Sequence, residues 1–260
     1  MVPPAVPLAP IEVLERAARG EPVDAPSVGG FVKAWIDGVA SDAQMAAWCG
    51  MVCAAGLDGA GTVELTRALL ASGQRLELAA LGPVGSVRGT GAVGDSVPLV
   101  VTPLAASLGV RVAAIAEPGV GHTGGALDKL AAIPGFTADL PLDRFVRQVR
   151  DVGVAMSGAG TTLAPADARL SALRDQTGTL RGRPLVSASL MSRAIASGGQ
   201  AIVADLRAGE GAPLGDEVEA REAARDMEAI AAAWGRRLRW RVSLADAPMG
   251  RFVGNALEVG

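Results

Sequence analysis

The sequence predicts an α/β protein: a small all-helical lobe plus an α/β lobe with a largely parallel sheet. Three observations support this fold class. Apolar residues recur at helical spacing over residues 10–80 without any strand pattern. Short apolar runs start near residue 81 and alternate with helical patterns, as in parallel sheets. Residues 165–197 are helical again and are expected to return to the first lobe. We therefore assign residues 1–80 and 165–197 to the helical lobe, and 81–164 and 198–260 to the α/β lobe.

Helices are expected throughout the first part of the chain. Ile11, Leu14 and Ala18 recur at helical spacing, and Gly20 follows them as a stop signal. Asp42 stands where its side chain can cap the helix that follows. The other helices expected here span residues 31–40, 42–55 and 63–72.

Strands and helices alternate in the second part. Trp240, Val242 and Leu244 alternate with polar or charged residues, as in a half-exposed strand. The expected strands span residues 84–88, 111–116, 152–156, 201–206 and 238–244. Helical patterns lie between them at 98–108, 142–149 and 216–234.

The composition argues against several classes of function. The net charge of −3, the aromatic fraction of 3% and the absence of tyrosine argue against a nucleic-acid partner. No apolar run reaches the roughly 18 residues of a membrane span, and the N-terminus lacks the positive region of a signal peptide. We therefore expect a cytoplasmic protein with no membrane partner. Cys49 and Cys53 fit no zinc or disulfide pattern and are expected to be buried thiols.

A glycine-rich segment follows the first expected strand. Residues 87–95 read Val-Arg-Gly-Thr-Gly-Ala-Val-Gly-Asp. Such a loop ahead of a helix exposes backbone N–H groups at the helix N-terminus, which suits an anion such as phosphate. A tight strand-to-helix turn without a ligand explains the same glycines equally well.

Several motifs together resemble one family. They read GHTGGALDKL at residues 121–130, LAPAD at 163–167, ALRD at 172–175, SASLMS at 187–192 and NALEV at 255–259. In this order and spacing they resemble the thymidine and pyrimidine nucleoside phosphorylases, which are related to anthranilate phosphoribosyltransferase. The resemblance runs from about residue 10 to the end. It implies a helical domain and an α/β domain with the active site between them. It also implies homodimers joined through the helical domain, and cleavage of a pyrimidine nucleoside by phosphate.

The resemblance implies a clamp for the pyrimidine base. Arg174 of the ALRD motif and Ser189 of the next helix match family residues that hold the base, and Arg193 stands where the family has Lys. Ser189 and Arg193 are four residues apart and should share a helix face. Ser171 replaces a family Tyr, so this wall of the site should be smaller.

Two of these residues have structural alternatives. Arg174 would have no ligand role if it formed an ion pair with Asp167 or Asp175. His122, the only histidine, is a candidate substrate contact, but it belongs to a turn that the family uses structurally rather than as a general base.

The phosphate site of the family is largely replaced. The family's Lys, His and Ser are Val87, Arg88 and Gly89 here, and three further hydroxyl positions are Pro98, Ala116 and Ala126. Because charge-assisted contacts to phosphate are worth roughly 1.5–3 kcal/mol each, we expect a poor or inactive phosphorylase with ordinary phosphate.

Four residues remain near that site. Arg88 restores one positive charge, Thr90 and Gly91 remain in the loop, and Glu117 would repel phosphate if it faces the cleft. We expect Arg88, Arg174 and Arg193 to act in catalysis, and Thr90, Gly91 and Glu117 to contact the substrate.

The expected function is that of a pentosyltransferase-like homologue that binds a pyrimidine or pyrimidine-like nucleoside or nucleotide, without cofactor or metal. Two alternatives stay open: a specialised-metabolism enzyme acting on a pyrimidine-like small molecule, and a non-catalytic binding or partner subunit. Family members continue past the NALEV motif into a C-terminal domain, whereas this sequence stops at Gly260. We expect that domain to be lacking, or a partner chain to replace it. In some relatives the Glu of NALEV, here Glu258, helps to bind a monovalent cation.

Overall fold

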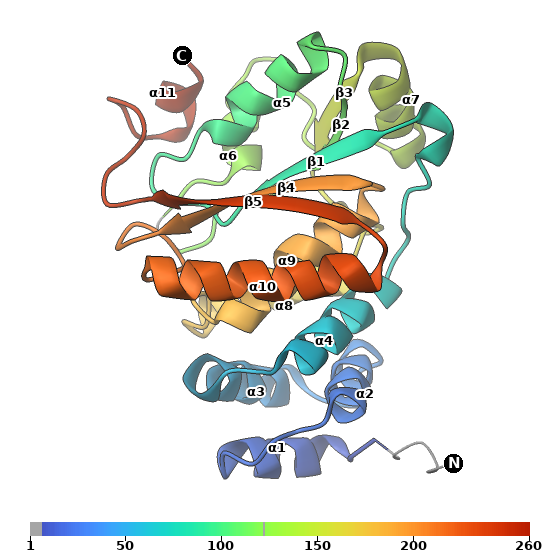
Figure 1. Cartoon of the computed structure of the whole chain (residues 1–260), viewed down its shortest axis with the longest axis vertical. Coiled ribbons are helices and arrows are strands. Elements are labelled where there is room, and N and C mark those ends of the chain that lie inside the picture. The colour runs from blue at the N-terminus through green and yellow to red at the C-terminus, as the bar shows by residue number, and fades with distance from the viewer. Residues whose placement is uncertain (1–6, 122) are drawn as a thin grey trace.

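The computed structural model describes residues 7–121 and 123–260 and shows two lobes (Figure 1). A bundle of helices that begins at the N-terminus packs beneath a second lobe built on a parallel sheet. The predicted fold class is therefore confirmed.

Four helices form the first lobe: α1 (Pro10–Ala18), α2 (Ala25–Ile36), α3 (Asp42–Ala55) and α4 (Gly59–Ala71). Their apolar faces enclose Phe31, Trp35 and Trp48, all essentially inaccessible to solvent. Helix α2 starts earlier than the expected 31–40, because Asp24 accepts a hydrogen bond from the Ser27 N–H at 2.9 Å and caps the helix there.

The predicted cap of α3 is wrong by one residue. Ser41, in extended conformation, accepts a hydrogen bond from the Gln44 N–H at 3.2 Å, and the Ser41 N–H donates in return to Gln44 Oε1 at 2.9 Å. Asp42 lies in the first turn instead. Its carboxylate accepts from Trp35 Nε1 at 2.7 Å and from Arg169 Nη2 at 2.6 Å. It therefore ties α3 to α2 and to a later helix.

The sheet has five parallel strands in the order β3-β2-β1-β4-β5. They are β1 (Val84–Gly89), β2 (Arg111–Ile115), β3 (Val154–Ser157), β4 (Ala201–Ala208) and β5 (Arg237–Leu244). The chain winds outward from β1 in both directions, so the strand order reverses there. In open α/β sheets, ligands bind at the carboxyl ends of the strands at such a switch point. The glycine loop begins at this end of β1.

Helices cover both faces of the sheet (Figure 1). On one side lie α5 (Val97–Ser107), α6 (Ala126–Ala131) and α7 (Leu142–Val152). The other side holds α9 (Arg183–Ala196) and α10 (Glu217–Ala233). The remaining elements are a 3-10 turn, η1 (Ala79–Leu81), helix α8 (Pro165–Gln176) and the last helix, α11 (Asn255–Val259).

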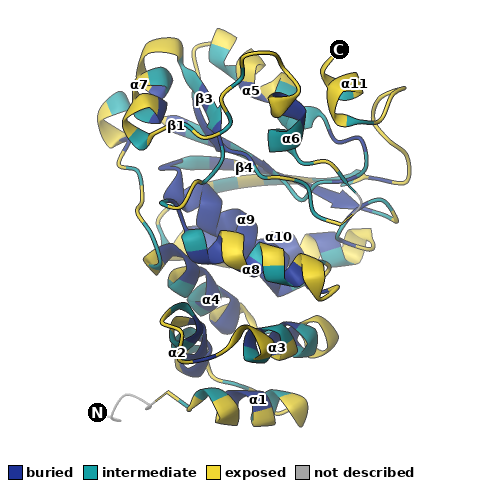
Figure 2. Cartoon of the chain, turned by 180° about the vertical axis from the view of Figure 1, so that it is seen from behind, coloured by how far each residue is buried: buried dark blue, intermediate teal, exposed yellow. Residues whose placement is uncertain are grey.

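Helix α9 joins the two lobes. All its residues from Pro184 to Ala196 are buried, as Figure 2 shows by its dark colour. Leu185 and Ala188 belong to the core of the helical lobe, whereas Leu190 and Met191 belong to the core of the α/β lobe. The proposed assignment of residues 165–197 to the helical lobe stays a prediction, because α9 contributes to both cores.

The two cysteines differ in their exposure to solvent. Cys49 is buried, and burial raises the pKa of its thiol to about 12. Cys53 is exposed, so the expectation of two buried thiols is wrong for it. Cys53 lies in the last turn of α3, and its Sγ lies 3.5 Å from the Thr179 carbonyl oxygen. Across residues 7–121 and 123–260, no helix has the length and hydrophobicity that a membrane crossing requires.

Candidate functional site

A cavity of about 350 Å³ lies at the carboxyl ends of β1 and β2, beside α8 and α9. Eight of the nine residues expected at the substrate site line it; His122 lies outside the described residues. We call one side the clamp wall, formed by Ser171, Arg174, Ser189 and Arg193 of α8 and α9. The other side, the loop wall, is formed by Arg88, Thr90, Gly91 and Asp95. Glu117, just after β2, also lines the cavity.

Arg174 anchors the clamp wall. Its guanidinium donates to the carbonyl oxygens of Thr179 at 3.1 Å, Leu180 at 2.8 Å and Leu185 at 3.4 Å. Its side chain is buried, and burial lowers its pKa. A guanidinium nevertheless stays charged in proteins. Three of its five N–H donors are used, and two have no partner among the described residues.

The structure does not contain the ion pair that was the structural alternative for Arg174. Among the described residues, neither Asp167 nor Asp175 forms an ion pair with it. Asp175 accepts from the Gly121 N–H at 2.8 Å, and Asp167 pairs with Arg193. Arg174 therefore faces the cavity as a cation without a carboxylate partner of its own in the part of the chain that the structure describes.

Arg193 and Ser189 share a helix face, as their spacing predicted. Arg193 Nη2 donates to Ser189 Oγ, and Arg193 Nε lies 3.0 Å from an Asp167 oxygen. Asp167 is completely buried, and burial raises the pKa of its carboxyl, which the nearby Arg193 opposes. The remaining terminal nitrogen of Arg193 pairs with Glu117.

Arg88 does not offer a free charge to the cavity, contrary to the expectation. It donates to the Ile115 carbonyl and, through Nη2, to Glu117 Oε1 at 2.8 Å. Glu117 does face the cavity: its side chain is 31% exposed, against 6% for Arg88. A carboxylate therefore stands in front of the guanidinium.

The glycine loop forms the tight turn that its sequence allows. Gly91 and Gly94 have φ values of +78° and +69°, which L side chains rarely adopt. However, several amides that would bind an anion are used inside the protein. The N–H groups of Thr90 and Val93 donate to Asp205 and Gly211 carbonyls, both at 3.1 Å.

The N-terminus of α5 is also occupied. Asp95 Oδ1 accepts a hydrogen bond from the Val97 N–H at 3.1 Å, and Pro98 has no N–H to offer. The negative group that a helix N-terminus favours is thus supplied by the chain itself. Asp95 thus occupies the place where the glycine pattern predicted a bound anion.

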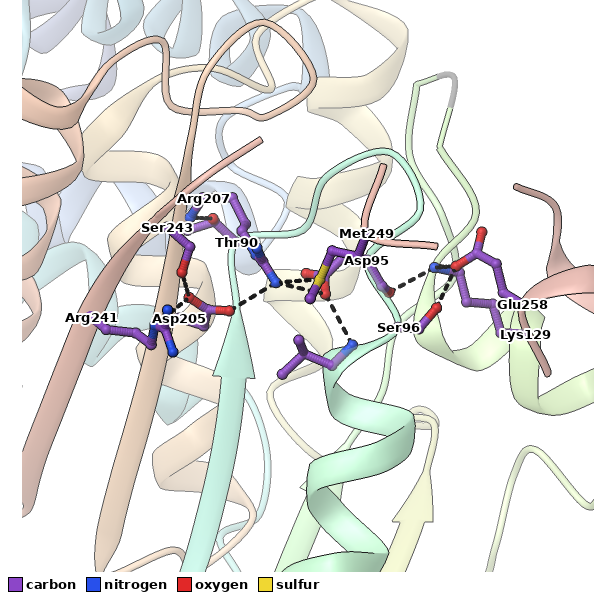
Figure 3. A network of polar contacts seen from close by, with 11 residues as sticks. Thr90, Asp95, Ser96, Lys129, Asp205, Arg207, Arg241, Ser243, Met249 and Glu258 are labelled. Atoms are coloured by element: carbon purple, nitrogen blue, oxygen red, sulfur yellow. Dashed lines mark hydrogen bonds and ion pairs between the residues drawn. The ribbon is translucent and has the colours of Figure 1, made fainter. Parts of the chain in front are cut away.

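Sequence reasoning missed a polar network behind the loop wall (Figure 3). Arg207 Nη2 lies 3.0 Å from an Asp205 carboxylate oxygen and 3.4 Å from Asp95 Oδ1. The backbone N–H of Arg207 donates to Thr90 Oγ1 at 2.7 Å. Two charged residues at alternate positions of an otherwise apolar strand, Asp205 and Arg207, were the signal that could have revealed it.

Glu258 completes this network from the C-terminal helix. Lys129 Nζ lies 2.6 Å from the Glu258 carboxylate and donates to the Asp95 carbonyl at 2.7 Å, and Ser96 donates to Glu258 at 2.8 Å. Burial alone would raise the pKa of Glu258, but the bonds from Lys129 and Ser96 outweigh it and hold the pKa below its ordinary value. An ammonium group thus sits where the family resemblance suggested a monovalent cation. Among the described residues, no cluster of three His, Cys, Asp or Glu side chains is arranged to hold a metal.

Comparison with known proteins identifies the class. Residues 82–260 match the model described as "Glycosyl transferase family, a/b domain", and residues 11–73 match "Glycosyl transferase family, helical bundle domain". The chain belongs to this glycosyl transferase family.

Individual relatives are more specific. The chain is 43% identical over 253 residues to a protein named thymidine phosphorylase from Mycobacterium tuberculosis, covering 96% of this chain and 58% of the relative. It is 38% identical over 250 residues to a pyrimidine-nucleoside phosphorylase from Bacillus subtilis, with the same coverages of 96% and 58%. The chain thus spans less than two thirds of the length of these relatives.

A solved structure shares the fold. Anthranilate phosphoribosyltransferase from Thermus thermophilus superposes with a TM-score of 0.67 at 17% identity, covering 88% of this chain and 65% of that one. At this identity the likeness concerns the fold alone, and it agrees with the relation that the motifs implied.

Proposed function

We propose that this chain is a pentosyltransferase-type enzyme that binds a pyrimidine or pyrimidine-like nucleoside or nucleotide in the cavity between its two walls. The observation that carries the proposal is the convergence of Arg174, Ser189 and Arg193 on one cavity at the switch point of the sheet. The relatives named thymidine and pyrimidine-nucleoside phosphorylase support the substrate class.

The clamp wall suits a departing pyrimidine. When the bond between base and pentose breaks, negative charge develops on the ring oxygens and nitrogen. Fixed donors in a site that excludes water stabilise such charge strongly. Arg174 and Ser189 both line the cavity, and two N–H groups of Arg174 have no partner among the described residues. On the loop wall, Arg88 is paired with Glu117 and Asp95 occupies the start of α5. We therefore propose that ordinary phosphorolysis is slow.

The binding test is a calorimetric titration with uracil, uridine and thymidine. Ser189→Ala removes a cavity hydroxyl and should weaken binding by about tenfold, the effect of one hydrogen bond of roughly 1.4 kcal/mol. Ser187→Ala is the matched control on the same helix, because the Ser187 hydroxyl donates to the Ala223 carbonyl, away from the cavity.

Three results would count against this proposal. Equal weakening by both serine substitutions would mean that the effect is structural. Failure of any pyrimidine compound to bind the wild-type chain would remove the substrate class. Binding without release of free base, with or without phosphate, would favour the non-catalytic binding subunit.

Assembly and location remain proposals as well. On the family resemblance, we propose a cytoplasmic homodimer joined through the helical lobe. An exposed apolar stripe, formed by Val100 and Leu104 of α5 and by Leu108 directly after it, is a surface to which a partner chain could bind. Light scattering at micromolar concentration distinguishes a monomer, a dimer and a complex of two different chains.

A further inference from the structure

The cavity contains a small ion network with Glu117 at its centre. Oε1 of Glu117 accepts from Arg88 Nη2 at 2.8 Å, and Oε2 pairs with Arg193 Nη1. Each carboxylate oxygen thus has its own guanidinium. Arg193 is also paired with Asp167. The four side chains carry two positive and two negative formal charges, so the network is neutral when Glu117 is ionised.

Exposure shows which member of the network a ligand meets. The side chain of Glu117 is 31% exposed, whereas those of Arg88 and Arg193 are 6% and 7% exposed. All three line the cavity. A ligand entering this end therefore meets a carboxylate, and the guanidiniums lie behind it.

The Glu117 carboxylate lies where two guanidinium groups would hold a bound oxyanion. Two guanidiniums that converge on two oxygens of one group form the arrangement that proteins use to hold carboxylates and phosphates. Arg88 is not fully satisfied either, since its buried Nε has no hydrogen-bond partner among the described residues. Two Arg side chains that are more than nine-tenths buried thus define a site for an anion, and Glu117 fills it.

We propose that Glu117 is a tethered anion that closes this end of the cavity to free phosphate, and that an anion site formed by Arg88 and Arg193 lies beneath it. The proposal rests on the proposed function only for treating this cavity as the substrate site. It also defines the ligand class: a group that contacts Glu117 must donate a hydrogen bond, as a hydroxyl, an amine or water does, and an oxyanion is repelled.

The loop wall provides an independent observation that carboxylates of the chain occupy the anion positions of this cavity. Asp95 occupies the N-terminus of α5, the other place in this cavity where an anion would be stabilised. Both anion positions are therefore filled by carboxylates of the chain. Two negative groups at those positions would repel an incoming phosphate in an environment that screens charge less than water does.

The experiment removes the tethered carboxylate and titrates inorganic phosphate at constant ionic strength, by calorimetry and thermal denaturation. Glu117→Ala and Glu117→Ser are compared with Glu15→Gln, which removes the charge of an exposed residue on α1, far from the cavity. We expect both Glu117 variants to bind phosphate at least about tenfold more tightly than the wild type, because each charge-assisted contact contributes a factor of about ten or more. Glu15→Gln should behave as the wild type does.

A double variant locates the gained site. Arg88→Met added to Glu117→Ala should abolish the gained phosphate binding. Binding that survives in the double variant would place the anion elsewhere and overturn the proposal. The proposal would also be overturned if a folded Glu117→Ala or Glu117→Ser variant gained no affinity for phosphate. The same holds if the wild-type chain bound phosphate as tightly as these variants do. Uridine titration of the same proteins tests the proposed function separately, because a chain that fails to bind uridine can still gain the phosphate site.

Discussion

Arg174 on the clamp wall and Arg88 on the loop wall both line the cavity, but they differ in what their guanidinium groups are bound to. Arg174 is held by three backbone carbonyl oxygens, so its full charge remains for a ligand. Arg88, by contrast, is matched by Glu117. Asp95 supplies the negative group at α5. A backbone carbonyl orients a guanidinium without neutralising it, whereas a carboxylate does both.

The difference separates the two halves of a transferase reaction. On the clamp wall, which would hold a leaving base, Arg174 has no carboxylate partner among the described residues, although Arg193 is paired with Asp167 and Glu117. On the loop wall, which would hold an anionic acceptor, Arg88 and Asp95 are both paired with residues of the chain. A relative can thus retain recognition of one substrate while losing recognition of the other. The four predictions below test this contrast, from the largest expected effect to the smallest.

The largest effect concerns phosphorolysis itself. If only two charge-assisted phosphate contacts are lost, at roughly 1.5–3 kcal/mol each, transition-state stabilisation falls by about 3–6 kcal/mol, or two to four decades of rate. With uridine or thymidine and saturating phosphate, we expect a turnover of about 0.1 to 0.001 s⁻¹, compared with roughly 10 s⁻¹ for a typical enzyme. Release of free base is the measurement. A turnover of about 1 s⁻¹ or more would show that the loop wall suffices for phosphate.

The next effect concerns how the loop wall is anchored. The side chains of Lys129 and Glu258 are only 2% and 5% exposed, and Lys129 also holds the Asp95 carbonyl. Lys129→Met leaves a buried carboxylate unpaired and should lower the free energy of unfolding by about 3–5 kcal/mol. Urea denaturation measures this change in the free energy of unfolding. Adding Glu258→Gln to Lys129→Met should recover part of the lost stability. A loss below about 1 kcal/mol in Lys129→Met alone would mean that solvent reaches the Lys129–Glu258 pair.

The fold could be predicted in detail because its signals are local. Apolar periodicity located the strands to within a few residues, and eight of the nine residues that the motifs and the loop indicated line one cavity. Helix α2 began earlier than expected, because the signal was a cap at Asp24 rather than an apolar residue. The cap of α3 was misplaced by one residue, since Ser41 and Asp42 are both good capping residues and only the backbone conformation decides between them.

The pairings within the site could not be predicted in the same way. Glu117 is 29 residues from Arg88 in sequence, and the two meet only because β1 and β2 lie side by side in the sheet. Asp167 and Arg193 meet because α8 and α9 pack together. Motifs indicate which residues belong to a site, but whether a charge is free depends on tertiary neighbours.

The third effect concerns the clamp wall. Arg174→Ala removes a buried cation that holds three carbonyl groups, and should lower the free energy of unfolding by about 2–4 kcal/mol as well as abolish pyrimidine binding. Arg169→Ala, on the same helix, is the control: its side chain is 45% exposed and pairs with Asp42, so it should cost no more than about 1 kcal/mol. Urea denaturation and uridine titration are the readouts. Normal uridine affinity in a folded Arg174→Ala variant would remove Arg174 from the clamp.

The smallest effect is the pH dependence of the Glu258 contribution. The pKa of Glu258 is lowered from its ordinary value of 4.5, since Lys129 and Ser96 stabilise its ionised form in the folded state. The unfolded chain therefore takes up the proton first as the pH falls. The contribution is complete above about pH 4.5 and is lost as the pH falls through the lower folded-state pKa. The stability difference between wild type and Glu258→Gln should thus shrink on acidification below that value. In a Lys129→Met background the pH dependence should weaken, because the main group that lowers this pKa is gone. A difference that stays constant from pH 7 to pH 3 would mean that Glu258 anchors the loop wall by packing rather than by charge.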